Sequence, residues 1–170
     1  MANRTTIQAA FRRHAQVLTQ RPAIGHKTDI TKVRITDGLT CAIEDGDWQL
    51  TADLAPQCGG NGLGPTPGTL GRAALGSCLA ICYVMWAAEL NVPLTQVEVE
   101  VQADSDARGM YGVGDTPAGY QEVRYVVSVT SPAPHEDIMR VLDLAEAHSP
   151  YVNVFKQPQN VKRDVIINRV

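Results

Sequence analysis

Cysteine, aromatic residues and charge are all scarce in this 170-residue chain. It has four cysteines, 5% aromatic residues and 19% charged residues, and its formal net charge is −3 at pH 7. Four cysteines are too few to stabilise a secreted domain of this length through disulfide bonds, so we expect reduced thiols and a cytoplasmic protein. The small negative charge argues against nucleic-acid binding. A hydrophobic content of 44% excludes the disordered class.

Neither the N-terminus nor the longest uncharged run has the properties of a membrane signal. The first 20 residues lack the apolar core of a signal peptide. The uncharged run over residues 73–88 is shorter than the roughly 20 residues that span a bilayer. We therefore expect no membrane contact. The N-terminal segment, about residues 1–20, is instead predicted to be an amphipathic helix, with apolar residues at helical spacing: Ile7, Phe11, Ala15 and Leu18.

Segments in which apolar and polar residues alternate predict antiparallel strands. Three such segments lie within residues 31–54 and are separated by the hairpin signals Asp37-Gly38 and Asp45-Gly46. They predict a meander with one buried face. Two further strands are expected near residues 97–101 and 123–129, and a last one near residues 161–168.

Two more helices are predicted. A glycine- and proline-rich loop leads into an apolar segment over residues 69–90, which we interpret as a long, buried central helix. Another helix follows Pro134 and stops at Ser149-Pro150. Because helices and strands are segregated, the pattern indicates an α+β fold. The absence of repeats and linkers predicts one domain over residues 1–170.

Several chemical motifs are missing. The four histidines are scattered and form no recognised metal-ligand pair, so we expect no metal site. There is no phosphate-binding loop, no complete dinucleotide fingerprint and no Gly-x-Ser-x-Gly elbow, and no cofactor is predicted.

Two cysteines on the central helix carry more information. Cys78 and Cys82 are four residues apart and therefore share one helix face. A structural role is an open alternative, because free cysteine is a common small core residue. Cys78 lies too far into the helix for its dipole to act, so a reactive thiolate there needs a nearby arginine or lysine.

The residues around Cys78 resemble the helix signature of the OsmC/Ohr family. Gly64-Pro65-Thr66-Pro67-Gly68-Thr69-Leu70 leads into Ala73-Ala74-Leu75-Gly76-Ser77-Cys78-Leu79, after a glycine-rich loop. Ala147-His148-Ser149-Pro150-Tyr151 lies where the family has a Cys-Pro pair. The resemblance covers almost the whole chain apart from the N-terminal helix. It implies an OsmC-like α+β fold, with antiparallel sheets around a long central helix in an intertwined homodimer.

The same resemblance implies thiol-dependent reduction of organic or inorganic hydroperoxides. It makes Cys78 the peroxidatic, catalytic residue, which is oxidised to a sulfenic acid. Two positions depart from the family pattern. Ser149 occupies the position of the second cysteine and is expected to bind substrate, and Gly68 occupies the position of an acidic residue that orients an arginine. Arg34 is a candidate for that arginine, with an exposed strand residue as the alternative.

Two functions therefore stay open. One is a thiol peroxidase, whose partners are a small hydroperoxide and a thiol reductant. The other is a non-catalytic OsmC-fold protein that binds a small apolar molecule. For the enzyme we expect an external thiol to reduce oxidised Cys78, with Cys58 second and Cys82 third as resolving residues. Cys41, on a predicted buried strand face, is expected to be inert.

Overall fold

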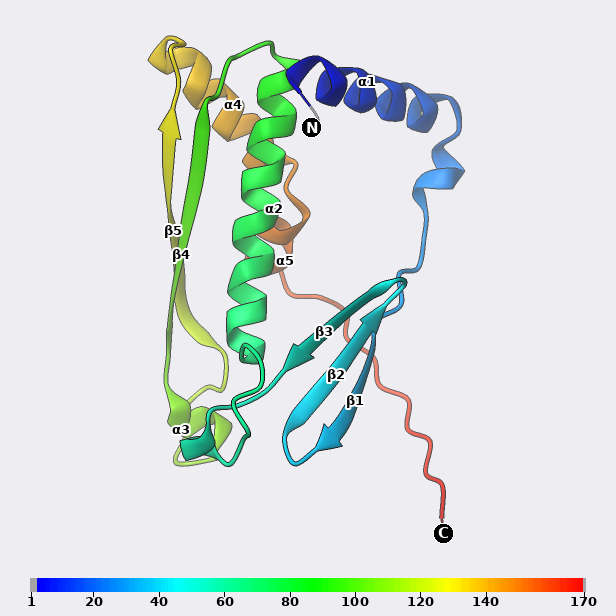
Figure 1. Ribbon diagram of the computed structural model, residues 1–170, viewed down its shortest axis with the longest axis vertical. Coiled ribbons are helices and arrows are strands. Elements are labelled where there is room, and N and C mark those ends of the chain that lie inside the picture. The colour runs from blue at the N-terminus through cyan, green and yellow to red at the C-terminus, as the bar shows by residue number, and fades with distance from the viewer. Residues whose placement is uncertain (1–2, 170) are drawn as a thin grey trace.

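The computed structural model describes residues 3–169 (Figure 1). Its helices are α1 (Arg4–Gln20), α2 (Pro67–Glu89), α3 (Ala107–Met110), α4 (His135–Ala147) and α5 (Pro150–Lys156), with 3₁₀ turns η1 (Pro22–Gly25) and η2 (Pro56–Cys58). Its strands are β1 (Lys32–Asp37), β2 (Thr40–Asp45), β3 (Trp48–Ala52), β4 (Gln96–Ser105) and β5 (Tyr120–Thr130). All strand pairs are antiparallel, which confirms the α+β prediction.

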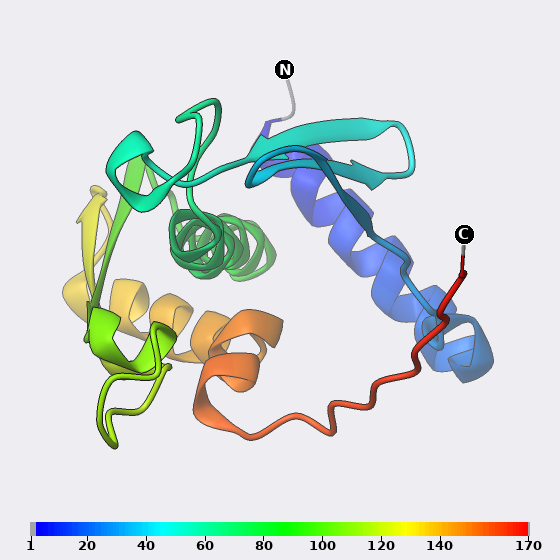
Figure 2. The ribbon, with the colours of Figure 1, turned by 90° about the horizontal axis from the view of Figure 1, so that it is seen from below.

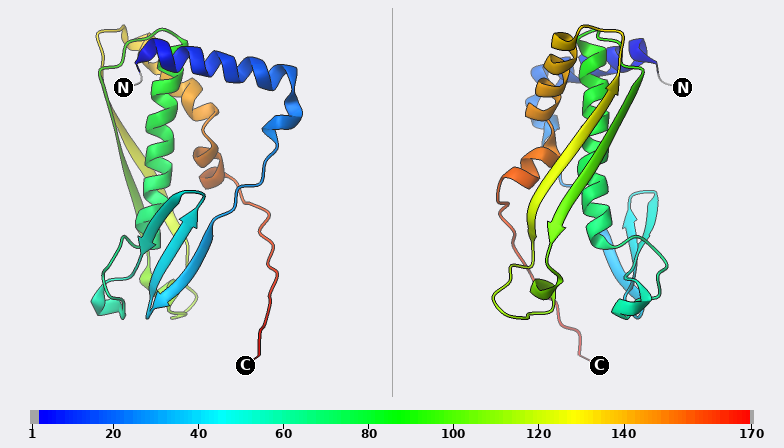
Figure 3. Two further views of the ribbon diagram at one scale, coloured as in Figure 1. Left: turned by 45° about the vertical axis from the view of Figure 1, so that its right-hand side comes forward. Right: turned by 90° about the vertical axis from the view of Figure 1, so that its left-hand side faces the viewer.

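Helix α2 lies between a two-stranded sheet and the helices α4 and α5 (Figures 2 and 3). In that sheet β4 and β5 are paired so that Val99 lies opposite Val127. The buried cluster between these layers consists of Leu75, Leu79, Tyr83, Ala145 and Val152. Burial of each large apolar side chain stabilises the fold by about 1.5–3 kcal/mol, so this cluster fixes α2 in place.

The residues at both ends of α2 suit their positions. Thr66 Oγ1 accepts a hydrogen bond from Thr69 N at 3.2 Å, and Pro67 occupies the first turn, where its missing N–H is not needed. After the helix, Asn91 adopts a left-handed φ of 58°, which asparagine tolerates. The predicted helix over residues 69–90 is confirmed, with its start two residues earlier.

Within this chain α2 is buried on only part of its circumference. One stripe of exposed side chains runs along it at four-residue spacing: Ala73, Ser77, Ile81 and Met85. The long central helix forms as predicted, and the chain's own sheet and helices cover its other faces only.

Helix α1 crosses the C-terminal end of α2 (Figure 1). Arg12 Nε lies 2.8 Å from a carboxylate oxygen of Glu89, and Gln8 Nε2 donates to the Glu89 carbonyl at 3.2 Å. Phe11 packs edge-on against Trp86, with ring centroids 5.3 Å apart. A helix C-terminus leaves carbonyls without partners and carries partial negative charge, so a basic residue suits this place. The predicted N-terminal helix is confirmed.

The sheet β1–β2–β3 extends away from α2 (Figures 1 and 2). The hairpin turns at Gly38 and Gly46 form as predicted, and both glycines have a φ of 54°. The expected burial of one face is wrong for the single chain, because Val33, Ile35 and Leu50 are all more than half exposed. Within residues 3–169, no second layer covers the sheet.

A buried carboxylate ties this sheet to the loop before α2. Asp53 accepts hydrogen bonds from Thr40 Oγ1 at 2.9 Å, Leu54 N at 2.7 Å, and Asn61 N and Leu63 N at 3.2 Å each. Burial of Asp53 opposes ionisation, but these donated hydrogen bonds outweigh it and lower its pKa. The glycine-rich loop is thus held by specific hydrogen bonds.

Two predictions near the C-terminus need correction. No strand forms near residues 161–168 within the described part of the chain, and residues 157–169 are extended without strand pairing. A strand needs a neighbouring edge for its backbone groups, and none lies beside this segment. Ser149-Pro150 ends α4 as predicted, but it also begins α5, a helix that was not predicted from the sequence.

Candidate functional site

Cys78 and Ser149 face each other across the contact between α2 and the start of α5. The Cys78 Sγ and Ser149 Oγ atoms are 3.4 Å apart. Cys78 is half-buried, whereas Ser149 is buried and is the N-cap of α5, where its hydroxyl also accepts from Val152 N at 3.4 Å. The structure therefore brings together the two residues that the family resemblance singled out.

Cys82 completes this cluster. Its thiol neighbours both Cys78 and Ser149. Burial, together with the neighbouring Cys78, raises the pKa of Cys82 to about 11. At neutral pH Cys82 is therefore a thiol, and it acts as a weak hydrogen-bonding neighbour rather than as a nucleophile.

One carboxylate beside the cluster accepts hydrogen bonds from two tyrosine hydroxyls. The Glu146 oxygens accept from Tyr83 Oη and Tyr125 Oη, each at 2.8 Å. Burial and the nearby Glu146 carboxylate raise the pKa of Tyr125 to about 12 and raise the pKa of Tyr83 as well. Ser149 N donates to the Glu146 carbonyl at 3.2 Å, so this network fixes the turn that carries Ser149.

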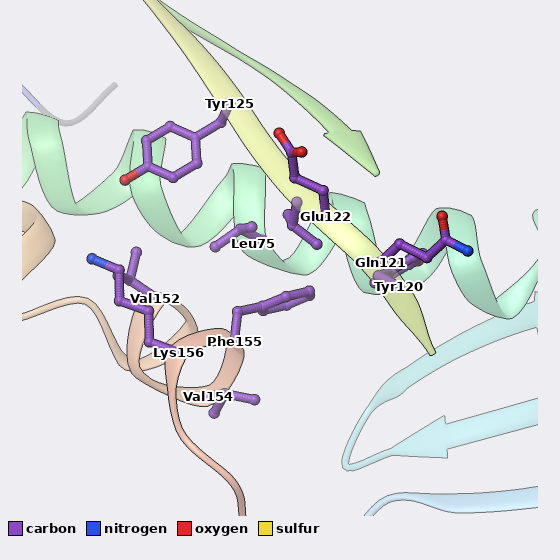
Figure 4. A pocket seen from close by; sticks show the side chains of 10 residues that line it. Leu75, Tyr120, Gln121, Glu122, Tyr125, Val152, Val154, Phe155 and Lys156 are labelled. Carbon is purple, nitrogen blue, oxygen red and sulfur yellow. The ribbon is translucent and has the colours of Figure 1, made fainter. Parts of the chain in front are cut away.

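An open, mainly apolar cavity of about 480 Å³ lies about one helical turn from the cysteine cluster, although Cys78, Cys82 and Ser149 do not themselves line it. Leu75 lies one helical turn before Cys78, and Val152 follows Ser149 by one turn of α5; both line the cavity (Figure 4). Tyr120 and Phe155 stack with ring centroids 6.4 Å apart on another wall, and Lys156 adds a cation. The cavity suits a small, mainly apolar molecule.

The other predicted site residues lie elsewhere. Arg34 Nη2 pairs with Glu44 Oε1 across the exposed sheet at 2.7 Å and makes no hydrogen bond to Cys78 in the described chain. Cys58 is exposed in η2. Cys41 is half-buried, so the expectation of a packed Cys41 is wrong, because its sheet is open.

Gly68 lies at the start of α2 beside two polar groups. Tyr120 Oη donates to its carbonyl at 3.1 Å. A Cβ at this position would meet Tyr120 Oη at 3.4 Å and Arg72 Nη1 at 3.5 Å. An acidic side chain here would therefore stand next to the guanidinium of Arg72 on α2, whereas the arginine that the family resemblance pairs with this position comes from the N-terminal sheet, where Arg34 was the candidate.

The contacts of Cys82 and the Glu146 network were not predicted from the sequence. Glu146 is a polar residue four positions after Leu142 on the apolar stripe of α4, which is a signal for a buried polar contact. The start of α5 had a signal too, because a serine followed by proline is typical of a helix N-cap and first turn.

Residues 3–169 offer little for metal binding and one long apolar helix. No group of three or more His, Cys, Asp or Glu side chains in this range could hold a metal ion. By length and composition alone α2 could cross a membrane, a test that core helices also pass.

Comparison with known proteins agrees with this geometry. The family model for OsmC-like proteins matches residues 59–163. An OsmC-like protein from Mycoplasma pneumoniae has 15% identity and a TM-score of 0.66, over 76% of this chain and 88% of that one.

Two hydroperoxide resistance proteins share the fold. The OsmC protein from Legionella pneumophila has 18% identity and a TM-score of 0.56, over 76% of this chain and 90% of that one. The protein from Elizabethkingia anophelis has 15% identity and a TM-score of 0.58, over 77% of this chain and 89% of that one. No curated protein sequence matches the chain. Since the family model covers more than half of its residues and the fold agrees, the chain belongs to the OsmC-like protein family.

Proposed function

We propose that this protein reduces hydroperoxides with Cys78 as the attacking thiol. The observation that carries the proposal is the 3.4 Å contact between Cys78 Sγ and the buried Ser149 hydroxyl, beside an open apolar cavity. A hydroxyl donor next to the sulfur stabilises a thiolate, and the cavity offers apolar walls to an organic hydroperoxide. Relatives described as organic hydroperoxide resistance proteins support this direction.

The reaction takes place in two stages. The Cys78 thiolate attacks the terminal hydroperoxide oxygen, so an S–O bond forms, the O–O bond breaks and the alcohol leaves after taking up a proton. Cys78 is now a sulfenic acid, oxidised by two electrons. A reductant thiol then displaces water to give a mixed disulfide. A second thiol releases reduced Cys78 and leaves with the reductant as a disulfide.

The proposed reductant is an external thiol. Ser149 cannot form a disulfide, and Cys58 is exposed in η2 without a hydrogen bond to the cluster. Cys82 is adjacent, but its pKa of about 11 leaves about one thiolate in 10⁴ at pH 7. Cys82 shares its helix with Cys78, so a disulfide between them would also strain the helix or the S–S torsion. The external thiol therefore stays first in the proposal, ahead of both Cys58 and Cys82.

The proposed active form is a homodimer. A compact 18.4 kDa protein exposes about 8,200 Å², whereas this chain exposes 12,897 Å². The surplus is about 4,700 Å², and an obligate dimer hides about 1,000–2,500 Å² on each partner. We treat residues 1–170 as one OsmC-like domain with α1 as an addition, acting in a reducing cytoplasm. The proposed partners include neither nucleic acid nor membrane.

A second function is supported by a specific observation. Within residues 3–169, no basic side chain forms a hydrogen bond or ion pair with Cys78, and the family's acidic position is Gly68. A thiol without a cation is weakly activated. The alternative is therefore a protein that holds a small apolar molecule in the cavity without turnover.

One experiment distinguishes the peroxidase function from the binding function. The protein and its Cys78→Ser and Cys41→Ser variants are mixed with an organic hydroperoxide and a dithiol, and peroxide loss is followed over many turnovers. The peroxidase proposal requires that turnover be lost in Cys78→Ser and kept in Cys41→Ser, and that mass spectrometry find the first oxidation at Cys78. If no variant consumes peroxide with any thiol, the binding function replaces it.

A further inference from the structure

Helix α1 presents an apolar groove to the outside of the molecule. The groove has a volume of about 520 Å³, and its walls come from one face of α1 and from the last part of α2. Its apolar lining consists of Ile7, Ala10, Phe11, Ala15, Leu18 and Met85. No residue of α1 is fully buried in the single chain. An apolar face of this kind on a monomer marks an interaction surface.

The groove is held in place by contacts within the chain. The Arg12–Glu89 ion pair and the Phe11–Trp86 ring contact fix α1 across the end of α2. Asn3 Oδ1 accepts from Thr6 N at 3.0 Å and caps the helix. The surface is therefore preformed and does not need a partner to create it. Helix α1 also lies outside residues 59–163, the part that matches the family model.

The groove continues the exposed stripe of α2. That stripe runs through Ala73, Ser77, Ile81 and Met85, and Met85 is also a wall of the groove. Side chains at four-residue spacing form the ridge that packs against another helix or sheet. A partner that covers the α2 stripe therefore reaches the groove without a gap.

We infer that the α1 groove is occupied by a second copy of this chain. The inference rests on the proposed homodimer and adds α1 to its interface. The chain exposes about 4,700 Å² more surface than a compact monomer of its mass would. This excess is larger than the surface that each partner buries in the larger obligate dimers. The exposed surface is therefore large enough for a dimer interface that includes α1. Its function is to extend the dimer interface beyond the elements that the family shares.

Photo-crosslinking tests which chain fills the groove. A benzoylphenylalanine residue replaces Ala15, which lines the groove, or Ala9, which is exposed on α1 outside it. After irradiation of the full-length protein we expect a covalent species of about twice 18.4 kDa from position 15 and none from position 9. Crosslinks from position 15 only to the same chain, or to a bound small molecule, would overturn the inference.

Charge substitutions provide the second measurement. Ala15→Glu/Leu18→Glu places two carboxylates in the groove, and Ala9→Glu/Gln16→Glu places two on the outer face as the matched control. Subunit exchange between two fluorescently labelled pools should become at least about tenfold faster in the groove variant and stay unchanged in the control. Circular dichroism confirms that both variants fold.

The outcomes distinguish the two proposals. A native protein with the mass of one chain would overturn both the homodimer and the groove inference. A native dimer whose exchange rate is unaffected by the groove variant, with no crosslink from position 15, would overturn the groove inference alone.

Discussion

Ser149 Oγ lies 3.4 Å from Cys78 Sγ although 71 positions separate the two residues in the chain. The hydroxyl occupies the position at which the family resemblance places a second cysteine. The contact between α2 and the start of α5 is therefore present, but a hydroxyl at Ser149 stands in place of the thiol. In the proposed reaction, that change decides how oxidised Cys78 returns to the thiol.

A Ser149→Cys variant should recover an internal disulfide. The present S···O distance is about 1.4 Å longer than an S–S bond of about 2.05 Å, a gap that side-chain torsions can close. After one equivalent of peroxide we expect peptide mapping to find a disulfide between Cys78 and the introduced thiol, and a free energy of unfolding higher by about 2–4 kcal/mol. Ser149→Ala serves as the control. Persistent free thiols in oxidised Ser149→Cys would contradict the geometry.

The alkylation rate of Cys82 should rise only at high pH. Burial and the neighbouring Cys78 place its pKa at about 11, so its thiolate accumulates only above about pH 10. We expect exposed Cys58 to react with iodoacetamide in mildly alkaline solution and Cys82 to lag behind it. Mass spectrometry of each cysteine peptide between pH 7 and pH 11 measures both. Equal rates at pH 8 would show that the Cys82 pKa is not raised.

Removing the Tyr83 hydroxyl should destabilise the protein. Tyr83 is fully buried, and its Oη donates to Glu146 at 2.8 Å. A hydrogen bond to a charged group contributes about 1.5–3 kcal/mol, so Tyr83→Phe should lower the free energy of unfolding by that amount. Chemical denaturation measures the loss. Tyr151→Phe, at an exposed tyrosine, is the matched control and should be neutral.

A glutamate at position 68 should stabilise α2. Gly68→Ala removes a helix-unfavourable glycine, a gain of about 0.5–1 kcal/mol. Gly68→Glu adds a carboxylate at the helix N-terminus beside Arg72 Nη1, a further gain of about 0.5–1 kcal/mol. Thermal unfolding compares the two variants. The extra gain of glutamate should shrink in 1 M salt, and its absence at low salt would refute the pairing.

The Asp53 carboxylate should make the stability of the folded protein fall as the pH is lowered. Its pKa is lowered in the folded protein, so its contribution is present above the unfolded pKa of about 4 and is lost as the pH falls through the folded value. Asp53→Asn should melt at a lower temperature than the native protein at pH 7, and the difference should narrow towards pH 3. Asp143→Asn, at an exposed position, tests for a general charge effect and should leave the melting curve unchanged.

Local patterns in the sequence were sufficient for much of the fold and part of the site. The Asp-Gly pairs determined the hairpins at Gly38 and Gly46 because those turns need a positive φ there. The apolar run over residues 69–90 predicted α2, which begins two residues earlier, at Pro67. The family motif identified Cys78 and Ser149, and their 3.4 Å contact agrees with it.

What escaped prediction depends on neighbours that are distant in the sequence. Alternation in residues 31–54 predicted an apolar face, but exposure of that face depends on a layer that residues 3–169 do not supply. In the C-terminal segment the apolar residues Val161 and Val165 alternate with polar ones, yet no strand edge in the described chain lies beside them. Glu146 could be located only once Tyr83 and Tyr125 were known to converge on it.

The Ser149 hydroxyl also links the thiol to the shape of the cavity. It contacts Cys78 Sγ and accepts from Val152 N, the residue that both begins the wall formed by α5 and packs into the core. A hydroxyl can donate one hydrogen bond while it accepts another, so Ser149 can contact the sulfur and hold Val152 N at the same time. The group that meets the Cys78 sulfur is therefore the one that caps α5 and orients the helix whose Val152 lines the cavity.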